Sequence, residues 1–186
     1  MLEQIISTDQ TVTSFLAGIL PHNSIFDTIF TFFSLNGISV YIWLFLLVGI
    51  IIWQRKYYRE LVVFFILSFT ITWIFVSVVV KNIVQRDRPW VVQNVDTTIC
   101  PKDFSFPSGH ASSAFAGATV FAYYDKKRRW LYYPLAILVA YSRIYLYCHY
   151  FLDVSIGALI GYLISRATLA LLPYRKKLLP HKEFTV

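Results

Sequence analysis

Apolar residues along this chain are gathered into long runs, and short polar segments separate the runs. Leu61–Val80 has twenty consecutive positions without a charge, which as a helix is long enough to cross a hydrocarbon core of roughly 30 Å. Four further runs have the same character, namely Val40–Trp53, Ala111–Tyr124, Trp130–Tyr141 and Val154–Leu172. The pattern predicts an all-α fold, a polytopic transmembrane helical bundle. Small residues dominate Ala111–Tyr124, which predicts close helix packing inside the bundle.

Composition supports a membrane protein and excludes disordered, collagen-like and disulfide-scaffold classes. Of the 186 residues, 57% are hydrophobic and 15% are charged, whereas soluble domains average about a quarter charged. The net charge of +7 would suggest nucleic-acid binding in a soluble protein, but in a membrane protein the distribution of basic residues among the loops is considered first. We expect no nucleic-acid partner and no obligate protein partner.

Basic residues fall in every second connection between the runs: Arg55, Lys56 and Arg59; Lys126, Lys127, Arg128 and Arg129; and Arg175, Lys176, Lys177 and Lys182. One side of the membrane therefore collects them, and the positive-inside rule assigns that side to the cytoplasm. We expect a multi-pass protein of the cell membrane with a cytoplasmic C-terminus. The segments 81–109 and 143–149 then face the periplasmic or extracellular side.

Residues 1–36 contain no Lys or Arg and no positive n-region of a signal peptide. Pro21–Ser24 divides them into two short apolar segments, which predicts interfacial or membrane-inserted helices and leaves five or six spans open. The expected organisation is this N-terminal part, a main transmembrane bundle over residues 37–173, and a basic cytoplasmic tail over residues 174–186.

Ionisable residues at the ends of membrane spans are costly and mark function by default. They occur in three clusters on the predicted outer side, namely Lys81 to Arg88-Pro89, Pro107 to His110, and Ser142-Arg143 with His149 and Asp153. Each cluster alone has a structural explanation: snorkelling basic residues, a helix N-cap, and a surface pair one helical turn apart. Their convergence on one face of a bundle that otherwise avoids charge favours a functional site.

Three cations aimed at one place favour a compact anion with more than one charge, and phosphate fits best. These cations are Lys81, Arg88 and Arg143. Gly109, at the start of a predicted helix, lets backbone N–H groups approach a phosphoryl oxygen.

His149 is the candidate nucleophile, because Asp153 lies one helical turn away and can hold the ring in one tautomer. His110 remains as the general acid, which protonates the leaving oxygen and later activates water. A catalytic metal fits poorly, since three nearby cations would repel a divalent ion. The loop acids Asp87, Asp96 and Asp103 are expected to be solvated. We expect no metal and no cofactor.

The three motifs, taken together, resemble the signature of the type 2 phosphatidic acid phosphatase (PAP2) superfamily. They read Lys-x6-Arg-Pro, Pro-Ser-Gly-His and Ser-Arg-x5-His-x3-Asp, in that order, and the resemblance covers about residues 40–172. It implies metal-independent phosphatase chemistry in a catalytic helical bundle. The nucleophile, its orienting acid and the general acid correspond to His149, Asp153 and His110. The phosphate-binding positions correspond to Lys81, Arg88 and Arg143, with hydrogen bonds from Ser108 and Gly109.

The resemblance also implies a phosphorylated membrane lipid as substrate, of the undecaprenyl (di)phosphate, phosphatidylglycerophosphate or lipid A type. Members that act on diphosphate-prenols often have Asp at the position of Gly109, and this departure counts against undecaprenyl diphosphate, which stays among the candidates. The alternative is a transporter or flippase that binds an anionic lipid with the same basic cluster and performs no chemistry. Cys100 and Cys148 both fall on the predicted outer side, where a disulfide is permitted; whether they are bonded is left open.

Overall fold

The computed structural model describes residues 1–34, 38–53, 58–92 and 100–171. Within these ranges every regular element is helical, as the apolar runs predicted. The longer helices are α1 (Leu2–Ala17), α2 (Ser24–Ser34), α3 (Ile38–Trp53), α4 (Tyr58–Trp73), α7 (Gly109–Tyr124), α8 (Arg129–Tyr145) and α9 (Phe151–Leu169). The shorter ones are the π-helical η2 (Ile74–Val80), α5 (Lys81–Val84), α6 (Pro89–Val92) and the 3-10 turn η3 (Lys126–Arg128).

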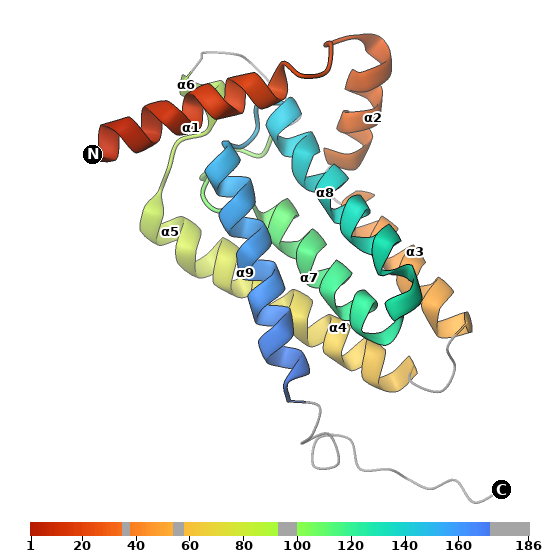
Figure 1. Cartoon of the computed structure of the whole chain (residues 1–186). Helices are drawn as coiled ribbons and strands as arrows, with labels where there is room; N and C mark the ends of the chain where they lie inside the picture. The colour runs from red at the N-terminus through yellow and green to blue at the C-terminus, as the bar shows by residue number, and fades with distance from the viewer. Residues whose placement is uncertain (35–37, 54–57, 93–99, 172–186) are drawn as a thin grey trace, which may run out of the picture.

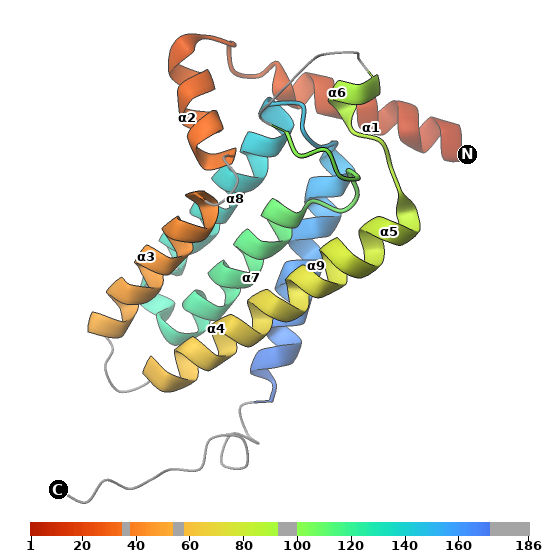
Figure 2. The ribbon, with the colours of Figure 1, turned by 180° about the vertical axis from the view of Figure 1, so that it is seen from behind.

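Helix α7 lies inside the bundle and packs against α4, α8 and α9 (Figures 1 and 2). Its buried aromatic core contains Trp43 of α3, Phe65 of α4, Phe121 of α7 and Tyr132 of α8. The rings of Phe65 and Phe121 stack with their centroids 5.1 Å apart. Because this core lies toward one end of the bundle, the opposite end is left for polar residues.

Glycines allow α9 to approach α7 closely, which confirms the packing expected of the small-residue helix. A Cβ atom on Gly157 would lie 2.6 Å from the carbonyl oxygen of Ser108, and one on Gly161 would lie 2.0 Å from that of Ser112. The spacing of four residues places both glycines on one face of α9. At the top of this contact the N–H of Ser108 donates to the carbonyl of Asp153 over 2.9 Å. The glycine contact therefore fixes how the start of α7 meets the start of α9.

Helices α4, η2 and α5 follow one another as a single long apolar element (Figure 2). Two stretches of the described chain are long and apolar enough to cross a membrane, Tyr58–Val92 and Phe151–Leu169. Shorter apolar helices cover Ser24–Ser34 and Tyr41–Trp53. Their large exposed hydrophobic side chains, such as Phe45, face outward, as in a protein surrounded by lipid.

The N-terminal segment forms two short helices, as its two apolar segments predicted. Helix α1 lies across one end of the bundle, and α2 runs along α8 (Figure 1). Helix α1 has one buried and one exposed face. Asp9, Thr13 and Ala17 are buried against the bundle, whereas Ile5 and Phe15 are exposed. An amphipathic helix of this kind suits a membrane interface.

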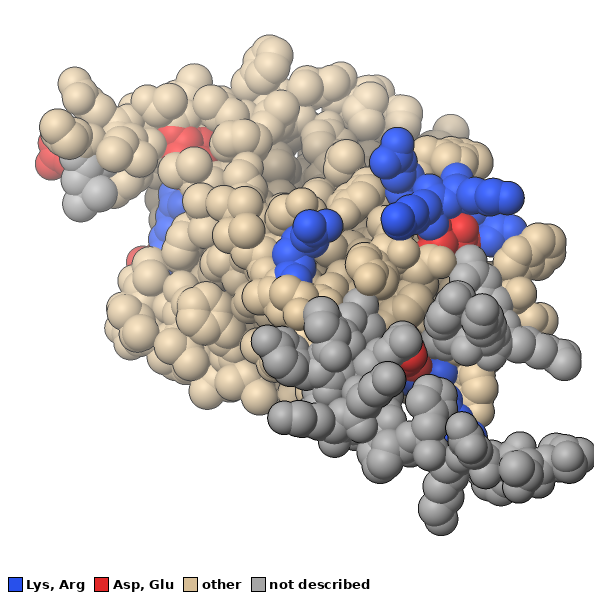
Figure 3. Space-filling view, turned by 60° about the horizontal axis from the view of Figure 1, so that its bottom comes forward, with Lys and Arg blue, Asp and Glu red and all other residues tan. Residues whose placement is uncertain are grey.

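Six of the described basic residues lie at the end of the bundle opposite α1, where α4 and α8 begin and α9 ends (Figures 1 and 3). They are Arg59, Lys126, Lys127, Arg128, Arg129 and Arg166. Arg55 and Lys56 of this predicted group, and the predicted tail 174–186, lie outside the described residues. The three motifs occupy the other end, so the two kinds of charged cluster are separated along the bundle axis.

Candidate active site

The three motifs meet beneath α1, each carried there by a different turn of the chain. Gln85 ends α5 in the left-handed conformation, with φ 50°, and so directs the next residues across the bundle. The segment 100–108 then leads back to the start of α7. A second turn, with Tyr147 at φ 53°, follows α8 and places His149 just before α9.

His149 is buried, with 1% of its surface exposed, and its Nδ1 atom faces two oxygen atoms. Nδ1 lies 3.5 Å from Oδ2 of Asp153 and 3.4 Å from Oγ of Ser105. The Ser105 hydroxyl in turn donates a short hydrogen bond to Oδ2 of Asp153. Ser105 is a site residue that the sequence reasoning missed, although it lies only two residues before the Pro-Ser-Gly-His motif.

The other ring nitrogen of His149 is turned toward Arg88. Nη1 of Arg88 lies 3.1 Å from Nε2 of His149. Because a guanidinium can only donate, Nε2 must be the unprotonated nitrogen, and the ring proton is on Nδ1. This tautomer leaves a lone pair on Nε2, as a histidine nucleophile requires.

Asp153 has a hydrogen-bond donor on each side of its carboxylate. Oδ2 also accepts from the N–H of Tyr150 over 2.9 Å, and Oδ1 accepts from Nη1 of Arg86 over 2.7 Å. Its side chain is fully buried, so these donors offset the cost of removing the carboxylate from water. Arg86, which the sequence analysis did not assign to the site, thus contacts the side of Asp153 that faces away from His149.

Arg143 is fully buried at the centre of the site and is incompletely satisfied. Its Nη1 atom donates to the backbone oxygen of Ser34 over 2.9 Å and makes a short contact with the Ser34 hydroxyl. Its Nε and Nη2 atoms have no hydrogen-bond partner among the described residues. Buried unpaired donors are rare in proteins, and a guanidinium edge left open in this way fits an oxyanion.

Lys81 and Arg88 are also buried, but both contact Asp103. Nζ of Lys81 makes a short ion pair with Oδ2 of Asp103, and Nη2 of Arg88 makes another with Oδ1. Nε of Arg88 further donates to the Asp103 carbonyl over 2.7 Å. Asp103 is half exposed, as expected of a loop acid, but its carboxylate is paired with both cations, and a phosphate would compete with it for them.

The pKa of Asp103 shows how strongly the cations act on it. Partial burial would raise the pKa of this carboxyl, but the hydrogen bond and charge of Lys81, together with the charge of Arg88, lower it below its ordinary value. Asp103 is therefore ionised at neutral pH. Asp87, by contrast, is exposed as expected, and Asp96 lies outside the described residues.

The Pro-Ser-Gly-His motif begins α7. Ser108 is the N-cap, and its hydroxyl accepts from the N–H of Ala111 over 3.4 Å. The N–H groups of Gly109 and His110 lie in the first helical turn, where no intrahelical acceptor exists for them. His110 is within electrostatic reach of all three predicted phosphate-binding cations and of His149. The structure thus brings all eight predicted site residues to one end of the bundle.

The surroundings of His149 favour its neutral form. Burial is the largest cause, and the charges of Arg88, Arg143 and Lys81 add to it; together they lower the pKa of His149 well below 6.5. The unprotonated imidazole is the form that can attack phosphorus.

No three His, Cys, Asp or Glu side chains converge as a metal site within the part of the chain that the structure describes. The donor set at the site consists mainly of cations, which suits an anionic ligand rather than a divalent ion.

Cys100 and Cys148 form a disulfide, with their Cα atoms 5.3 Å apart. The bond joins the loop that carries Asp103 to the turn that carries His149. The carbonyl of Cys148 also accepts a hydrogen bond from Nη1 of Arg88 over 2.8 Å, so the disulfide lies directly beside the predicted phosphate-binding cations.

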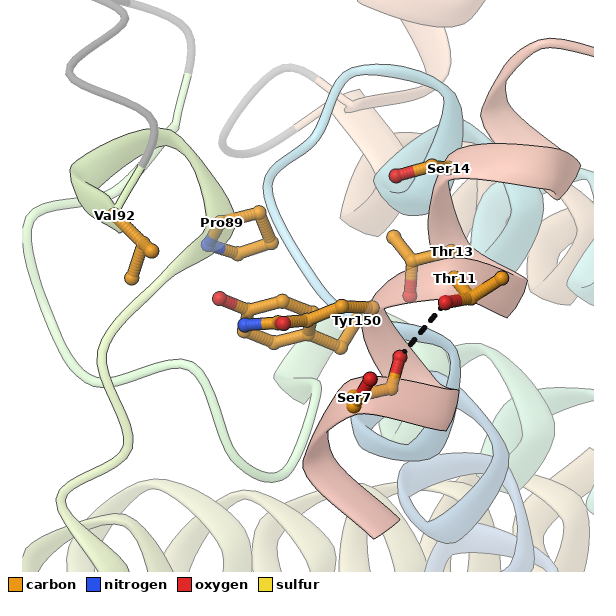
Figure 4. Close-up of a pocket in the computed structure, with 8 residues that line it drawn as sticks. Ser7, Thr11, Thr13, Ser14, Pro89, Val92 and Tyr150 are labelled. Atoms are coloured by element: carbon orange, nitrogen blue, oxygen red, sulfur yellow. Dashed lines mark hydrogen bonds between the residues drawn. The ribbon is translucent and has the colours of Figure 1, made fainter. Parts of the chain in front are cut away.

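A polar hollow of about 490 Å³ lies beside the site, between α1, α6 and Tyr150 (Figure 4). It is lined by Ser7, Gln10, Thr11, Thr13, Ser14, Pro89, Val92 and Tyr150. Pro89 and Tyr150 directly follow Arg88 and His149 in the chain. The lining carries no ionised side chain, so the charged cluster and the hollow are chemically distinct.

Comparison with known proteins identifies related sequences over most of the chain. Residues 61–177 match the model of the PAP2 superfamily. An undecaprenyl-diphosphatase of Sulfolobus acidocaldarius is 33% identical over 71% of this chain and 68% of its own length. Undecaprenyl-diphosphatase BcrC of Bacillus subtilis is 27% identical over 84% of this chain and 82% of its own length.

Two solved structures share the fold. The crystal structure of Aquifex aeolicus LpxE matches with a TM-score of 0.67 and 25% identity, covering 87% of this chain and 94% of that one. A transmembrane PAP2-type phosphatidylglycerolphosphate phosphatase from Bacillus subtilis matches with a TM-score of 0.69 and 20% identity, covering 97% of this chain and 89% of that one.

Proposed function

The chain belongs to the PAP2 superfamily and is a membrane lipid phosphatase, and on this premise we propose that His149 attacks the lipid phosphate and forms a phospho-histidine intermediate. The observation that carries the proposal is the orientation of His149. Its Nδ1 faces Asp153 and Ser105, and its Nε2 faces the cation cluster at Arg88.

The phosphate is bound by Arg143, Lys81 and Arg88. Support comes from the open Nε and Nη2 atoms of Arg143 and from Asp103, whose carboxylate already occupies the other two cations as an internal anion. The hydroxyl of Ser108 caps α7, and the N–H groups of Gly109 and His110 at its first turn are suitable donors for a phosphoryl oxygen.

The reaction proceeds in two steps. The Nε2 lone pair of His149 forms a bond to phosphorus while the bond from phosphorus to the lipid oxygen breaks, and His110 gives its proton to that oxygen. Water then attacks the phospho-histidine, His110 accepts the water proton, and phosphate leaves with His149 neutral again. Asp153 holds the Nδ1 proton and stabilises the imidazolium character that develops in each step.

The proposed topology has five membrane-spanning segments, with the active site on the periplasmic or extracellular side. Support comes from α2, whose 11 residues make a helix of about 17 Å, too short to cross the hydrocarbon core, and from α1, which lies across the bundle end (Figure 1). Six described basic residues, from Arg59 at the start of α4 to Arg166 in the last turn of α9, lie at the opposite end (Figure 3), which the positive-inside rule assigns to the cytoplasm.

The proposed substrate is a polyprenyl phosphate or diphosphate. Two relatives are undecaprenyl-diphosphatases by name. Diphosphate-prenol enzymes often have Asp at the position of Gly109. The polyprenyl monophosphate and diphosphate should therefore be compared directly as substrates. Phosphatidylglycerophosphate and lipid A are the remaining lipid phosphates to compare, because structures that share the fold include a phosphatidylglycerolphosphate phosphatase and LpxE.

The test is phosphate release by the purified full-length protein in detergent with EDTA. The panel contains undecaprenyl diphosphate, undecaprenyl phosphate, phosphatidylglycerophosphate, phosphatidate and lipid A. His149→Ala should abolish turnover, whereas the matched variant His22→Ala, at a histidine that stacks on Tyr145, should retain it. A phosphate label that survives alkaline denaturation in the wild type and is absent from His149→Ala would support the intermediate. Folded protein that is inactive on the whole panel would favour an anionic-lipid transporter, and substantial turnover by His149→Ala would contradict the nucleophile assignment.

A further inference from the structure

Helix α1 caps the start of α9 with its side chains. Oδ1 of Asp9 accepts from the N–H of Leu152, and Oγ1 of Thr13 accepts from the N–H of Phe151, each over 2.9 Å. The first N–H groups of a helix have no partner within the helix and need acceptors from elsewhere. Asp9, which is 3% exposed, thus belongs to the structure that supports the catalytic end of α9.

The other oxygen of Asp9 is connected to the catalytic acid through Arg86. Nη2 of Arg86 donates to Oδ2 of Asp9 over 2.7 Å, and Nη1 donates to Oδ1 of Asp153, also over 2.7 Å. The Cζ atom of the guanidinium lies over the ring of Tyr150, 3.9 Å from its centroid. Arg86 therefore bridges two buried carboxylates, one from α1 and one from α9, and its orientation is fixed by the aromatic ring.

We propose that Asp9 is a positioning residue for the phosphatase reaction, which holds Arg86 between the two carboxylates and so sets how strongly Asp153 supports His149. The proposal rests on the function of His149 proposed above. It assigns a role to α1, which lies outside the three motifs that characterise the family.

The physical argument is one of charge. With Asp9 ionised, the positive charge of Arg86 is shared between two carboxylates, and the group of three carries a net charge of −1. Without the charge on Asp9, Arg86 acts on Asp153 alone, and the group becomes neutral. This neutral group stabilises a positive charge on the His149 ring less than a group of net charge −1 does. In a buried site of low dielectric constant, the electrostatic interaction with the ring grows with the net charge of the group.

Every other charged group around His149 is independent of Asp9. The cations Arg88, Arg143 and Lys81 and the acid Asp103 act on His149 from the remaining sides, His110 faces it from α7, and Ser105 contacts Nδ1. Tyr150 is the other titratable group facing Arg86 and feels both Asp9 and Asp153. A substitution of Asp9 therefore changes one charge and leaves the phosphate-binding cations in place.

The test uses Asp9→Asn in the full-length protein in detergent. The substitution keeps an oxygen for the N–H of Leu152 and removes the charge. We expect kcat to fall roughly ten-fold, less than the roughly 10²–10⁴-fold that a general acid or base itself contributes, with KM changed less than about two-fold because the cations are unaltered. The acidic limb of the pH dependence of kcat/KM should move to lower pH, because a less stabilised imidazolium loses its proton more readily.

The double variant Asp9→Asn with Arg86→Gln separates positioning by charge from a purely structural role. It restores a net charge of −1 through Asp153 alone, so the acidic limb should return toward that of the wild type. Thr13→Ala is the structural control: it removes a cap of α9 without a charge change, so it should lower the unfolding temperature and leave the acidic limb in place.

An unchanged kcat and acidic limb in Asp9→Asn would overturn the proposal, as would a double variant whose limb stays displaced. If Asp9→Asn is not recovered as monodisperse protein, the double variant decides alone: a wild-type limb supports the proposal and a displaced limb overturns it. Failure of the proposed function has a different signature, namely a wild type without turnover or a His149→Ala variant that retains it.

Discussion

Nη1 of Arg88 donates a hydrogen bond to Nε2 of His149 over 3.1 Å, so a cation proposed to bind the phosphate covers the lone pair of the proposed nucleophile. Arg88 is at the same time engaged with the carboxylate of Asp103. A phosphate that binds the Arg88 guanidinium would displace Asp103 and leave Nε2 of His149 free to attack the phosphorus of the bound phosphate. Binding of the anion and exposure of the nucleophile are thus linked through one side chain.

The pH dependence of kcat/KM should have its acidic limb below the ordinary histidine pKa. Burial and the charges of Arg88, Arg143 and Lys81 lower the pKa of His149 below 6.5, and the neutral form is the nucleophile. Activity therefore persists as pH falls to 6.5 and declines only as pH passes through the lowered pKa. The alkaline limb reports loss of the proton that His110 must donate. Because Arg143, Arg88 and Lys81 act on His110 as well, this proton is held only while the bound phosphate offsets their charge, and the profile is then bell-shaped. A midpoint of the acidic limb above 6.5 would contradict the assignment, as would a profile without an acidic limb.

Asp103→Asn should tighten the binding of an oxyanion. The carboxylate pairs with both Lys81 and Arg88, so its neutralisation leaves two cations without their internal counter-charge. We expect the inhibition constant of vanadate to fall about ten-fold, in line with one charge-assisted hydrogen bond. Asp87→Asn is the matched control, because Asp87 is exposed, and it should leave inhibition unchanged. Weaker vanadate inhibition in Asp103→Asn would mean that Asp103 orients the two cations rather than competing with the ligand.

The sequence predicted which residues lie together at one end of the bundle, because the family motifs specify residue types at fixed spacing. It predicted the helices because long apolar runs allow few other structures in a membrane. Asp103 and Ser105 escaped prediction for a physical reason. Both lie in an irregular segment, where spacing along the chain does not say which side chains meet, and an acid in a loop is usually solvated.

The connection from Asp9 to Asp153 also could not be read from the sequence. The two residues are far apart in the chain, and only the placement of α1 across the bundle end brings Asp9 to Arg86. The first 36 residues contain only three acids and no Lys or Arg, and this composition does not say that one of the acids is buried. In the same way, the sequence allowed a disulfide between Cys100 and Cys148 but did not require one. The two cysteines are bonded because the fold brings the segments that carry them together.

Phosphatase activity should be insensitive to EDTA and inhibited by vanadate. The cation cluster neutralises the phosphate charge that a metal ion would otherwise neutralise, and vanadate resembles the five-coordinate phosphorus formed when His149 attacks. The measurement is phosphate release with and without EDTA, followed by titration of vanadate. Activity that is lost in EDTA and restored by a divalent ion would favour metal-dependent chemistry instead.

Arg143→Met should abolish activity without destabilising the substrate-free protein. The guanidinium is fully buried, and two of its nitrogen atoms have no partner among the described residues, so its burial costs free energy that an apolar chain of similar length does not. We expect kcat/KM to fall about a hundred-fold or more, since a charge-assisted contact to the phosphate is lost, while the unfolding temperature stays equal or rises. Vanadate should raise the unfolding temperature of the wild type and not of the variant. Arg59→Met, outside the site, should behave as the wild type.

Gly161→Ala should loosen the contact that aligns the two catalytic helices. The new Cβ would lie 2.0 Å from the carbonyl oxygen of Ser112, so α9 must move away from α7, at a cost of about 1–3 kcal/mol for an overpacked site. The hydrogen bond from Ser108 to the Asp153 carbonyl would lengthen with it, so activity should fall together with the unfolding temperature. Gly49→Ala is the control: no atom lies within 4 Å of its added Cβ, and the helix should be stabilised by about 0.5–1 kcal/mol. Equal effects of the two substitutions in thermal unfolding would show that close packing of α7 and α9 does not determine the geometry of the site.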